Sequence, residues 1–173
     1  MEGEVRTAAQ PVSEKTPVFR NIAISHMTIN HARVAINIEG LPEMAIKGLR
    51  ISDVIASAKT GMKASNTEAL ELHNVQVNAE SGPAFLVRDS KELEFDGVST
   101  RQPLAGTPVV RFDRCPGAIV RGSRAFAGTD TFLSVGPREL KSVTLVGNVF
   151  DSAKKATEEA LGPKPTHEPP TED

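Results

Sequence analysis

The stretch that decides the fold of this chain is Leu70-Glu71-Leu72-His73-Asn74-Val75-Gln76-Val77. Its first, third, sixth and eighth positions are apolar, and its other positions are polar. The same pattern occurs as Ile22-Ile24-Met27-Ile29, and weaker copies begin at Leu49, Leu93, Ala118 and Val143. Successive copies begin 21 to 27 residues apart. The chain therefore contains a sequence repeat with a period of about 24 residues.

A second strand pattern lies between the copies of the first one. It consists of two apolar residues separated by one residue, and it occurs as Ile36/Ile38, Met62/Ala64, Phe85/Val87, Val110/Phe112 and Leu133/Val135. Alternation with a period of two directs one face of a strand inward. Because both patterns share one period, each repeat is predicted to contain two inward-facing strand segments.

This pairing of strands predicts a solenoid. The two-residue gap in Leu72-His73-Asn74-Val75 lets the chain turn a corner and still direct the next side chain inward. One repeat cannot bury its own apolar face, whereas stacked repeats form a continuous core. We therefore expect an all-β, right-handed parallel β-helix of about six coils. A β-sandwich is the alternative, since it also contains short strands, but it does not explain the shared period.

Register follows from the repeat. We expect Ile22, Leu49, Leu70 and Leu93 to stack in one buried column, with neighbouring coils about 4.8 Å apart. A second column is expected to contain Ile36, Met62, Phe85 and Val110. Asn21, Asn66 and Asn74 fall near the expected turns, where asparagine tolerates a left-handed backbone. The segment Glu39–Glu43 does not repeat, and it is expected to form a protruding loop.

Composition divides the chain into four parts, which are an irregular lead-in at 1–17, the β-helix at 18–150, a capping helix at 151–162 and a disordered tail at 163–173. Asp151 can cap the expected helix over Ser152–Leu161, and Gly162 and Pro163 would end it. The lead-in is polar and offers little apolar cover. We therefore expect the first coil to be an open edge through which the chain self-associates.

Composition also excludes some classes of partner. The chain has 173 residues, a net charge of −2 and no Trp or Tyr, and its lysines and arginines are scattered. This argues against nucleic acid and anionic membranes as partners, and it offers no aromatic platform for sugars apart from phenylalanine. The N-terminal residues have neither the basic nor the apolar region of a signal peptide, and no apolar run is long enough to span a membrane.

No complete catalytic site is predicted from the residues. The acidic candidates are Glu39, Glu43, Asp53, Asp89, Asp96, Asp113 and Asp130, which fall in different repeats and mostly beside turn residues. His26 and His73 are expected at matching corners, while His31 and His167 fit no metal-binding spacing. Cys115, the only cysteine, is expected to be a small buried residue. No metal ion or other cofactor is indicated by any motif.

Three stretches nevertheless resemble bacterial members of glycoside hydrolase family 28, the polygalacturonase-like enzymes. They are Thr16-Pro17-Val18-Phe19-Arg20-Asn21-Ile22, then Ile38-Glu39-Gly40-Leu41-Pro42-Glu43, and later Ser81-Gly82-Pro83-Ala84-Phe85. The resemblance covers roughly residues 11–150. It implies a right-handed β-helix, hydrolysis of galacturonic-acid linkages with inversion, a pectic polysaccharide as partner, and export.

The resemblance does not extend to the catalytic residues of the family. The family's Asn-x-Asp, Asp-Asp, Gly-His-Gly and Arg-x-Lys motifs all precede the matching segment, and none occurs in this chain. No catalytic residue can therefore be assigned here by resemblance. We expect the chain to correspond to the C-terminal half of such an enzyme and to be inactive alone. The alternative function is a non-catalytic β-helix module that binds a polysaccharide or stacks on a partner.

Overall fold

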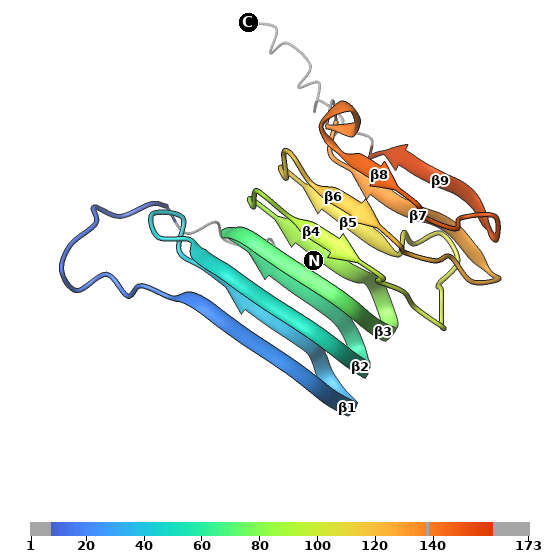
Figure 1. Cartoon of the computed structure of the whole chain (residues 1–173), viewed down its shortest axis with the longest axis horizontal. Helices are drawn as coiled ribbons and strands as arrows, with labels where there is room; N and C mark the ends of the chain where they lie inside the picture. The colour runs from blue at the N-terminus through green and yellow to red at the C-terminus, as the bar shows by residue number, and fades with distance from the viewer. Residues whose placement is uncertain (1–7, 138, 161–173) are drawn as a thin grey trace, which may run out of the picture.

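The computed structural model describes residues 8–137 and 139–160, and it shows a right-handed parallel β-helix of about six turns (Figure 1). Its first three strands are long because each runs along two faces of the solenoid. They are β1 (Arg20–Glu39), β2 (Ile46–Ser65) and β3 (Thr67–Arg88). β2 lies between the other two and pairs with both in parallel.

Beyond β3 the two faces consist of separate shorter strands. One face continues through β4 (Glu94–Asp96), β6 (Ile119–Arg121) and β8 (Thr144–Val146). The other continues through β5 (Val110–Asp113), β7 (Thr129–Val135) and β9 (Ala153–Glu159). A short 3₁₀ helix, η1 (Leu140–Ser142), precedes β8. All pairings between these strands are parallel, which excludes the β-sandwich alternative.

The strand register defines the coils and confirms the order of the predicted columns, although their first members, Ile22 and Ile36, are only partly buried. Ile22 pairs with Leu49, which pairs with Leu70, and the next position continues to Leu93 because Glu71 pairs with Glu94. The second column runs through Ile36, Met62, Phe85 and Val110. By this register we number the coils from one to six, and they begin at Phe19, Ile46, Thr67, Ser90, Cys115 and Leu140.

Aromatic rings fill the middle of the core. Phe85, Phe95 and Phe112 are fully buried. The ring of Phe95 packs edge-on against the other two, with ring centres 6.1 Å from Phe85 and 5.1 Å from Phe112. Further along the solenoid, Phe132 stacks on Phe150 of the last coil at 4.2 Å. Such pairs stabilise a core beyond the area that they bury.

The corner after the first strand segment has a left-handed backbone in every coil. The residues at this corner have φ between +52° and +66°, and they are His26, Asp53, Asn74, Gly97, Gly122 and Gly147. Glycine, asparagine and aspartate adopt this conformation at the least cost. The expectation for asparagine is confirmed, because Asn21, Asn66 and Asn74 all have positive φ. The two-residue gap of the repeat is therefore a left-handed corner.

The predicted capping helix is wrong. Residues 153–159 form β9, which pairs in parallel with β7 so that Leu133 lies beside Thr157. The alanines, lysines and glutamates of this segment favour a helix, but the free edge of β7 offers backbone hydrogen bonds, and tertiary pairing overrides a weak local propensity. Leu161, Gly162 and the tail predicted at 163–173 lie outside the described residues.

The first coil forms one end of the solenoid and is poorly covered. Among the strands of residues 8–137 and 139–160, β1 pairs only with β2, so its outer edge has no partner in this part of the chain. Three of its apolar side chains are exposed, with Ile24 and Met27 each 39% and Phe19 55% accessible to solvent. Residues 8–19 form no strand and contain one turn, in which the N–H of Thr16 donates to the carbonyl of Ser13. The described part of the predicted lead-in is thus irregular, as expected.

Candidate functional site

Most of the seven candidate acids pair with cations, and Asp89 and Asp113 lie in adjacent coils, where the N–H of Asp89 donates to the backbone carbonyl of Asp113. Asp89 accepts two hydrogen bonds from the guanidinium of Arg114, at 2.6 and 2.8 Å. Asp130 lies 2.6 Å from Lys154 Nζ and also accepts the N–H of Gly106. The lysine contact, followed by this backbone bond, holds the pKa of Asp130 below its ordinary value. These carboxylates connect neighbouring coils.

The remaining candidates divide between corners, strands and one loop. Asp53 accepts a hydrogen bond from the Asn74 amide at 2.8 Å, across one coil step. Asp113 contacts Arg111 and Arg88 at 3.2 and 3.5 Å. The other three are Asp96 on the outer face of β4, Glu39 at the end of β1, and Glu43 in the loop that follows β1.

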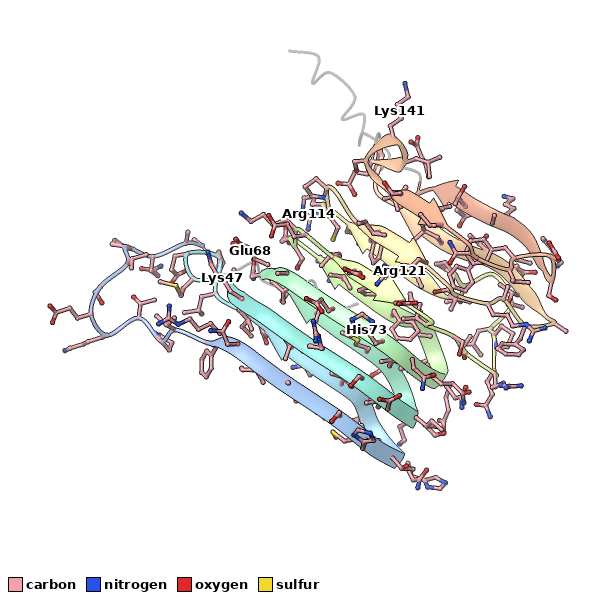
Figure 2. All side chains as sticks on the ribbon, in the orientation of Figure 1. Lys47, Glu68, His73, Arg114, Arg121 and Lys141 are labelled. Carbon is pink, nitrogen blue, oxygen red and sulfur yellow. The ribbon has the colours of Figure 1, made fainter. Side chains whose placement is uncertain are left out.

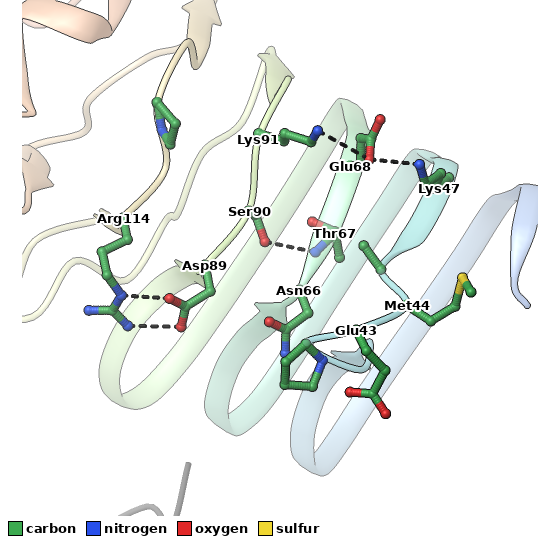
Figure 3. A pocket seen from close by; sticks show the side chains of 13 residues that line it. Glu43, Met44, Lys47, Asn66, Thr67, Glu68, Asp89, Ser90, Lys91 and Arg114 are labelled. Atoms are coloured by element: carbon green, nitrogen blue, oxygen red, sulfur yellow. Dashed lines mark hydrogen bonds and ion pairs between the residues drawn. The ribbon is translucent and has the colours of Figure 1, made fainter. Parts of the chain in front are cut away.

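Glu43 lies beside a cleft at the corner shared by the second, third and fourth coils (Figure 3). The cleft has a volume of about 490 Å³. Its lip is the Glu39–Glu43 segment predicted to protrude, which forms a tight turn closed by two hydrogen bonds between Leu41 and Met44, at 3.0 and 3.2 Å. Its floor includes Thr67 and Ser90, the first residues of two successive coils.

The lip is held at this corner by the residues of the coil beneath it. The N–H of Gly40 donates to the carbonyl of Ser65, and the side-chain amide of Asn66 donates to the carbonyl of Gly40 at 3.0 Å. A Cβ atom at residue 40 would lie 2.1 Å from the carbonyl oxygen of Asn66. Only glycine permits this close approach, so the Gly-Leu-Pro-Glu motif has a steric reason for its first residue.

A charged ladder runs along the rim of the cleft. Glu68 accepts contacts from Lys47 at 3.0 Å and from Lys91 at 3.4 Å, one coil to either side. Lys47, the stronger influence, holds the pKa of Glu68 below its ordinary value of 4.5. Figure 2 shows Lys47, Glu68 and Arg114 at this end of successive coils. The rim is therefore charged but locally neutralised.

Two buried polar atoms of the cleft have no partner among the described residues. They are Oε2 of Glu43 and the hydroxyl oxygen of Thr67. An unsatisfied buried polar atom costs about 1–3 kcal/mol, so such atoms are uncommon unless a ligand or water completes them. The N–H of Thr67 is already bonded to Ser90 Oγ at 3.0 Å. Both atoms are closed to solvent, so only a water or a ligand group that displaces the lip could pair with them.

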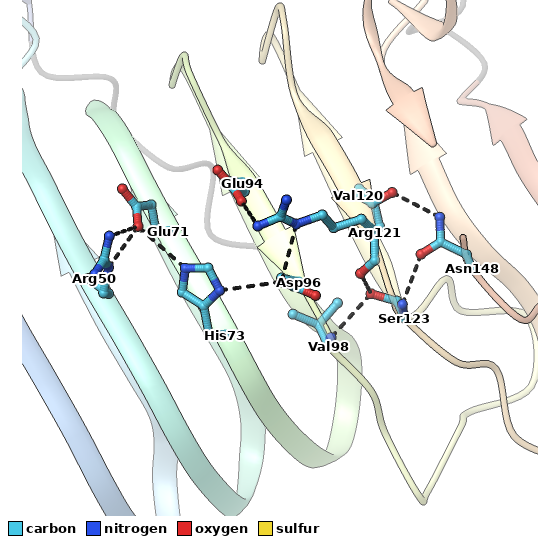
Figure 4. Close-up of polar contacts among 10 residues, drawn as sticks. All are labelled: Arg50, Glu71, His73, Glu94, Asp96, Val98, Val120, Arg121, Ser123 and Asn148. Carbon is cyan, nitrogen blue, oxygen red and sulfur yellow. Dashed lines mark hydrogen bonds and ion pairs between the residues drawn. The ribbon is translucent and has the colours of Figure 1, made fainter. Parts of the chain in front are cut away.

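A second polar array crosses the outer face of β2, β3, β4 and β6 (Figure 4). Arg50 contacts the carboxylate of Glu71 at 2.6 Å, and His73 lies 3.3 Å from the same oxygen. His73 also lies 3.6 Å from Asp96. Arg121 contacts Asp96 at 3.1 Å and pairs with Glu94 as well. This row consists of outward positions that the register aligns across four coils.

The array corrects the prediction for the histidines. His26 and His73 were expected at matching corners, but Ser25 pairs with Ser52 and Ser52 with His73. His73 therefore occupies the outward position just before the corner, and His26 occupies the corner itself. The difference of one residue places His73 between two carboxylates, whereas the ring of His26 is exposed and lies 3.9 Å from Asp53.

Cys115 is buried, as predicted, and its burial raises the pKa of the thiol to about 12. The thiol is therefore protonated at neutral pH, which does not suit a nucleophile. Within residues 8–137 and 139–160 no three potential ligands gather in a way that could hold a metal ion. Over the same residues no helix is long and apolar enough to cross a membrane.

Of the cleft residues, Glu43 and Asp89 are candidate acids of the sequence analysis and Asn66 is an expected turn residue, whereas the charged ladder and Thr67 are not predicted there. Lys47, Glu68 and Lys91 occupy one register position in three successive coils, where their charges alternate. Aligning the outward positions of the repeat, and not only the inward ones, would have indicated this ladder. Nothing in the sequence pattern indicates the unpartnered hydroxyl of Thr67, because its environment depends on three coils at once.

Comparisons with protein-family models, with curated proteins and with solved structures found no match to this chain. The fold and the site define the class of protein as a right-handed parallel β-helix with a polar cleft at one corner.

The pairing of Glu71 predicts a specific dependence of stability on pH. Arg50 is the largest influence that lowers the pKa of Glu71, and His73 adds to it. A carboxylate whose pKa is lowered by folding contributes stability above its unfolded pKa, and this contribution disappears as pH falls through the folded value. We expect Glu71→Gln to destabilise the chain by about 1 kcal/mol at pH 7, with the difference vanishing below the lowered pKa.

Denaturant titrations from pH 2.5 to pH 7 measure this difference. The matched control is Glu80→Gln, which removes an exposed carboxylate of the same strand that forms no ion pair with any residue the structure describes. The control is expected to stay close to the parent chain throughout. A constant difference between Glu71→Gln and the parent at every pH would contradict the prediction.

Proposed function

We propose that this chain is the C-terminal β-helix portion of a pectin-degrading glycoside hydrolase of the polygalacturonase type. In this proposal it supplies coils of the enzyme's solenoid, and the catalytic aspartates are supplied by further coils that stack on the first one. The ligand is a pectic polysaccharide. The proposal rests on the resemblance to glycoside hydrolase family 28 together with the geometry of the first coil, where the resembling stretch begins.

The observation that carries the proposal is the open first coil. The resemblance begins at residues 16–22, which lead into β1, and β1 has a free edge with exposed Ile24 and Met27. A further coil would satisfy the free backbone groups of β1 and cover these side chains at the usual spacing of about 4.8 Å. Motifs that precede Thr16 in the family would lie in coils stacked against this edge.

The acidic residues of this chain also support the proposal that the catalytic aspartates belong to further coils. Inverting hydrolysis needs a general acid and a general base about 6.5–9.5 Å apart. Asp89, Asp113 and Asp130 are each paired with a cation of the solenoid itself, which occupies their carboxylate oxygens. Their roles in the structure are connections between neighbouring side chains and coils.

This proposal predicts that the chain alone will not release reducing ends from polygalacturonate. Extension at its N-terminus with coils that carry the Asp-Asp and Gly-His-Gly motifs is expected to produce hydrolysis. The control is the same extended chain with both aspartates of the Asp-Asp motif changed to Asn. Activity of the chain alone that is lost in Asp53→Asn, Asp89→Asn or Asp113→Asn would contradict the proposal, as would an extended chain that folds but does not hydrolyse.

A second candidate function is a non-catalytic module that binds polysaccharide. It is favoured by the cleft itself, in whose wall the buried oxygens of Glu43 and Thr67 lack a partner that a sugar hydroxyl could supply once the lip moves. Retention of the chain on immobilised pectin, with loss of retention in Thr67→Val, would favour this function. Thr67→Ser keeps the hydroxyl and is the matched control.

A further inference from the structure

Two arginines converge on one aromatic ring at a place remote from the cleft. The guanidinium carbon of Arg101 lies 4.2 Å from the centre of the Phe126 ring, and that of Arg124 lies 5.6 Å from it. Arg101 belongs to the fourth coil, where it lies within the long connection between β4 and β5, drawn in yellow-green in Figure 1. Arg124 belongs to the fifth coil.

Both side chains are cations without a carboxylate partner in the described part of the chain. Residues 46–137 contain seven arginines, of which Arg50, Arg88, Arg111, Arg114 and Arg121 each contact a carboxylate. Within the described residues no ion pair is found for Arg101 or Arg124, and both are exposed. The two positive charges at one ring repel each other. An anion placed between them would remove this repulsion and add two attractive contacts.

The fold holds the two cations in place. The backbone N–H of Arg101 donates to Asn78 Oδ1 at 2.9 Å, and the backbone of Arg124 pairs with Val149 of the last coil. Phe126 is partly buried and offers its ring to both guanidinium groups. A cation held over an aromatic ring loses less freedom on binding an anion, and its planar group still presents several N–H donors.

We propose that Arg101 and Arg124 form a binding site for a carboxylate group of an acidic oligosaccharide. The guanidinium fork matches a carboxylate, and the hydrogen bonds are strengthened by charge. The choice of a uronate sugar rests on the proposed function, in which the ligand is a pectic polysaccharide. The site lies outside the cleft and needs neither the cleft residues nor any catalytic acid. Its role is to hold the polymer at a second point on the solenoid.

Electrophoresis of the folded chain in gels that contain polygalacturonate tests this site. Polygalacturonate is expected to retard the parent chain, and fully methyl-esterified polygalacturonate, which lacks the charge, is expected to have little effect. The variant Arg101→Gln/Arg124→Gln is expected to bind about tenfold more weakly or worse. The control is Arg20→Gln/Arg33→Gln, which removes the same charge from exposed positions of the first coil and is expected to bind like the parent chain.

The variant Phe126→Leu tests whether the position of the two arginines, and not only their charge, contributes to binding. It keeps both cations and most of the apolar volume, and intermediate binding is expected because the ring no longer holds the guanidinium groups. Circular dichroism confirms the fold of each variant.

Equal loss in the two double variants would overturn the proposal, as would an unretarded parent chain. Equal retardation by single-stranded DNA would overturn the assignment to sugars. The proposed function fails separately, through an extended chain that does not hydrolyse polygalacturonate.

Discussion

Phe95→Ala is expected to lower the free energy of unfolding by about 3–5 kcal/mol. Phe95 is fully buried in the fourth coil, and its ring contacts Phe85 of the third coil and Phe112 of its own coil. Alanine would leave a cavity in the middle of the solenoid, where the stacked backbones on both faces restrict collapse. The loss therefore combines the transfer free energy of the ring, the cavity and two aromatic contacts.

Urea unfolding followed by circular dichroism measures this loss. The matched control is Phe19→Ala, which removes the same side chain from the open end of the solenoid, where it is 55% exposed. This control is expected to change stability by about 0.5 kcal/mol or less. If the two variants were equally stable, the assignment of Phe95 to the centre of the core would be wrong.

Gly61→Ala is expected to destabilise the chain by about 3 kcal/mol or more. A Cβ atom at this position would lie 2.3 Å from the carbonyl oxygen of Pro83 and 2.4 Å from that of Ala84. Both atoms belong to the backbone of the next coil and cannot move aside as a flexible side chain can. The added methyl group would therefore force the second and third coils apart at the bend of β2, where the register also shifts.

Gly82→Ala is the matched control, because it adds the same methyl group in open space. No atom lies within 4 Å of the corresponding Cβ position, but φ is +72°, so the cost is the left-handed backbone alone, about 1–2 kcal/mol. Thermal melts of both variants compare the two costs. A Gly82→Ala variant that melts below Gly61→Ala would show that backbone conformation, and not contact between coils, dominates at these glycines.

The residues that face the core of the solenoid, and its corners, could be predicted from the sequence. The apolar positions recur with one period, and a strand with alternating residues can bury only one face. The columns through Leu49 and through Met62 follow from that pattern, as do the left-handed corners at Asn21, Asn66 and Asn74. These features are local or repeat regularly, so a single chain reveals them.

The contacts of the outward-facing side chains could not be predicted in the same way. Glu68 joins Lys47 and Lys91, and this ladder is visible only when the outward positions of neighbouring coils are aligned with one another. The candidate acids Asp89 and Asp113 proved to be paired with arginines from other positions. His26 and His73 differ by one position relative to the aligned Ile22 and Leu70, so the inward columns themselves place His73 opposite Ser25 and not opposite His26.

The sequence by itself determined the period, the inward residues and the corners, and these specify a parallel β-helix. Only the tertiary structure decided that residues 153–159 form a strand, since their local preference is helical and the free edge of β7 supplies the competing hydrogen bonds. It alone brought Thr67 and Glu43 to one cleft, and Arg101 and Arg124 to one ring. The reason is physical, because burial depends on each residue's own pattern, whereas a binding site depends on residues that stacking brings together from different coils.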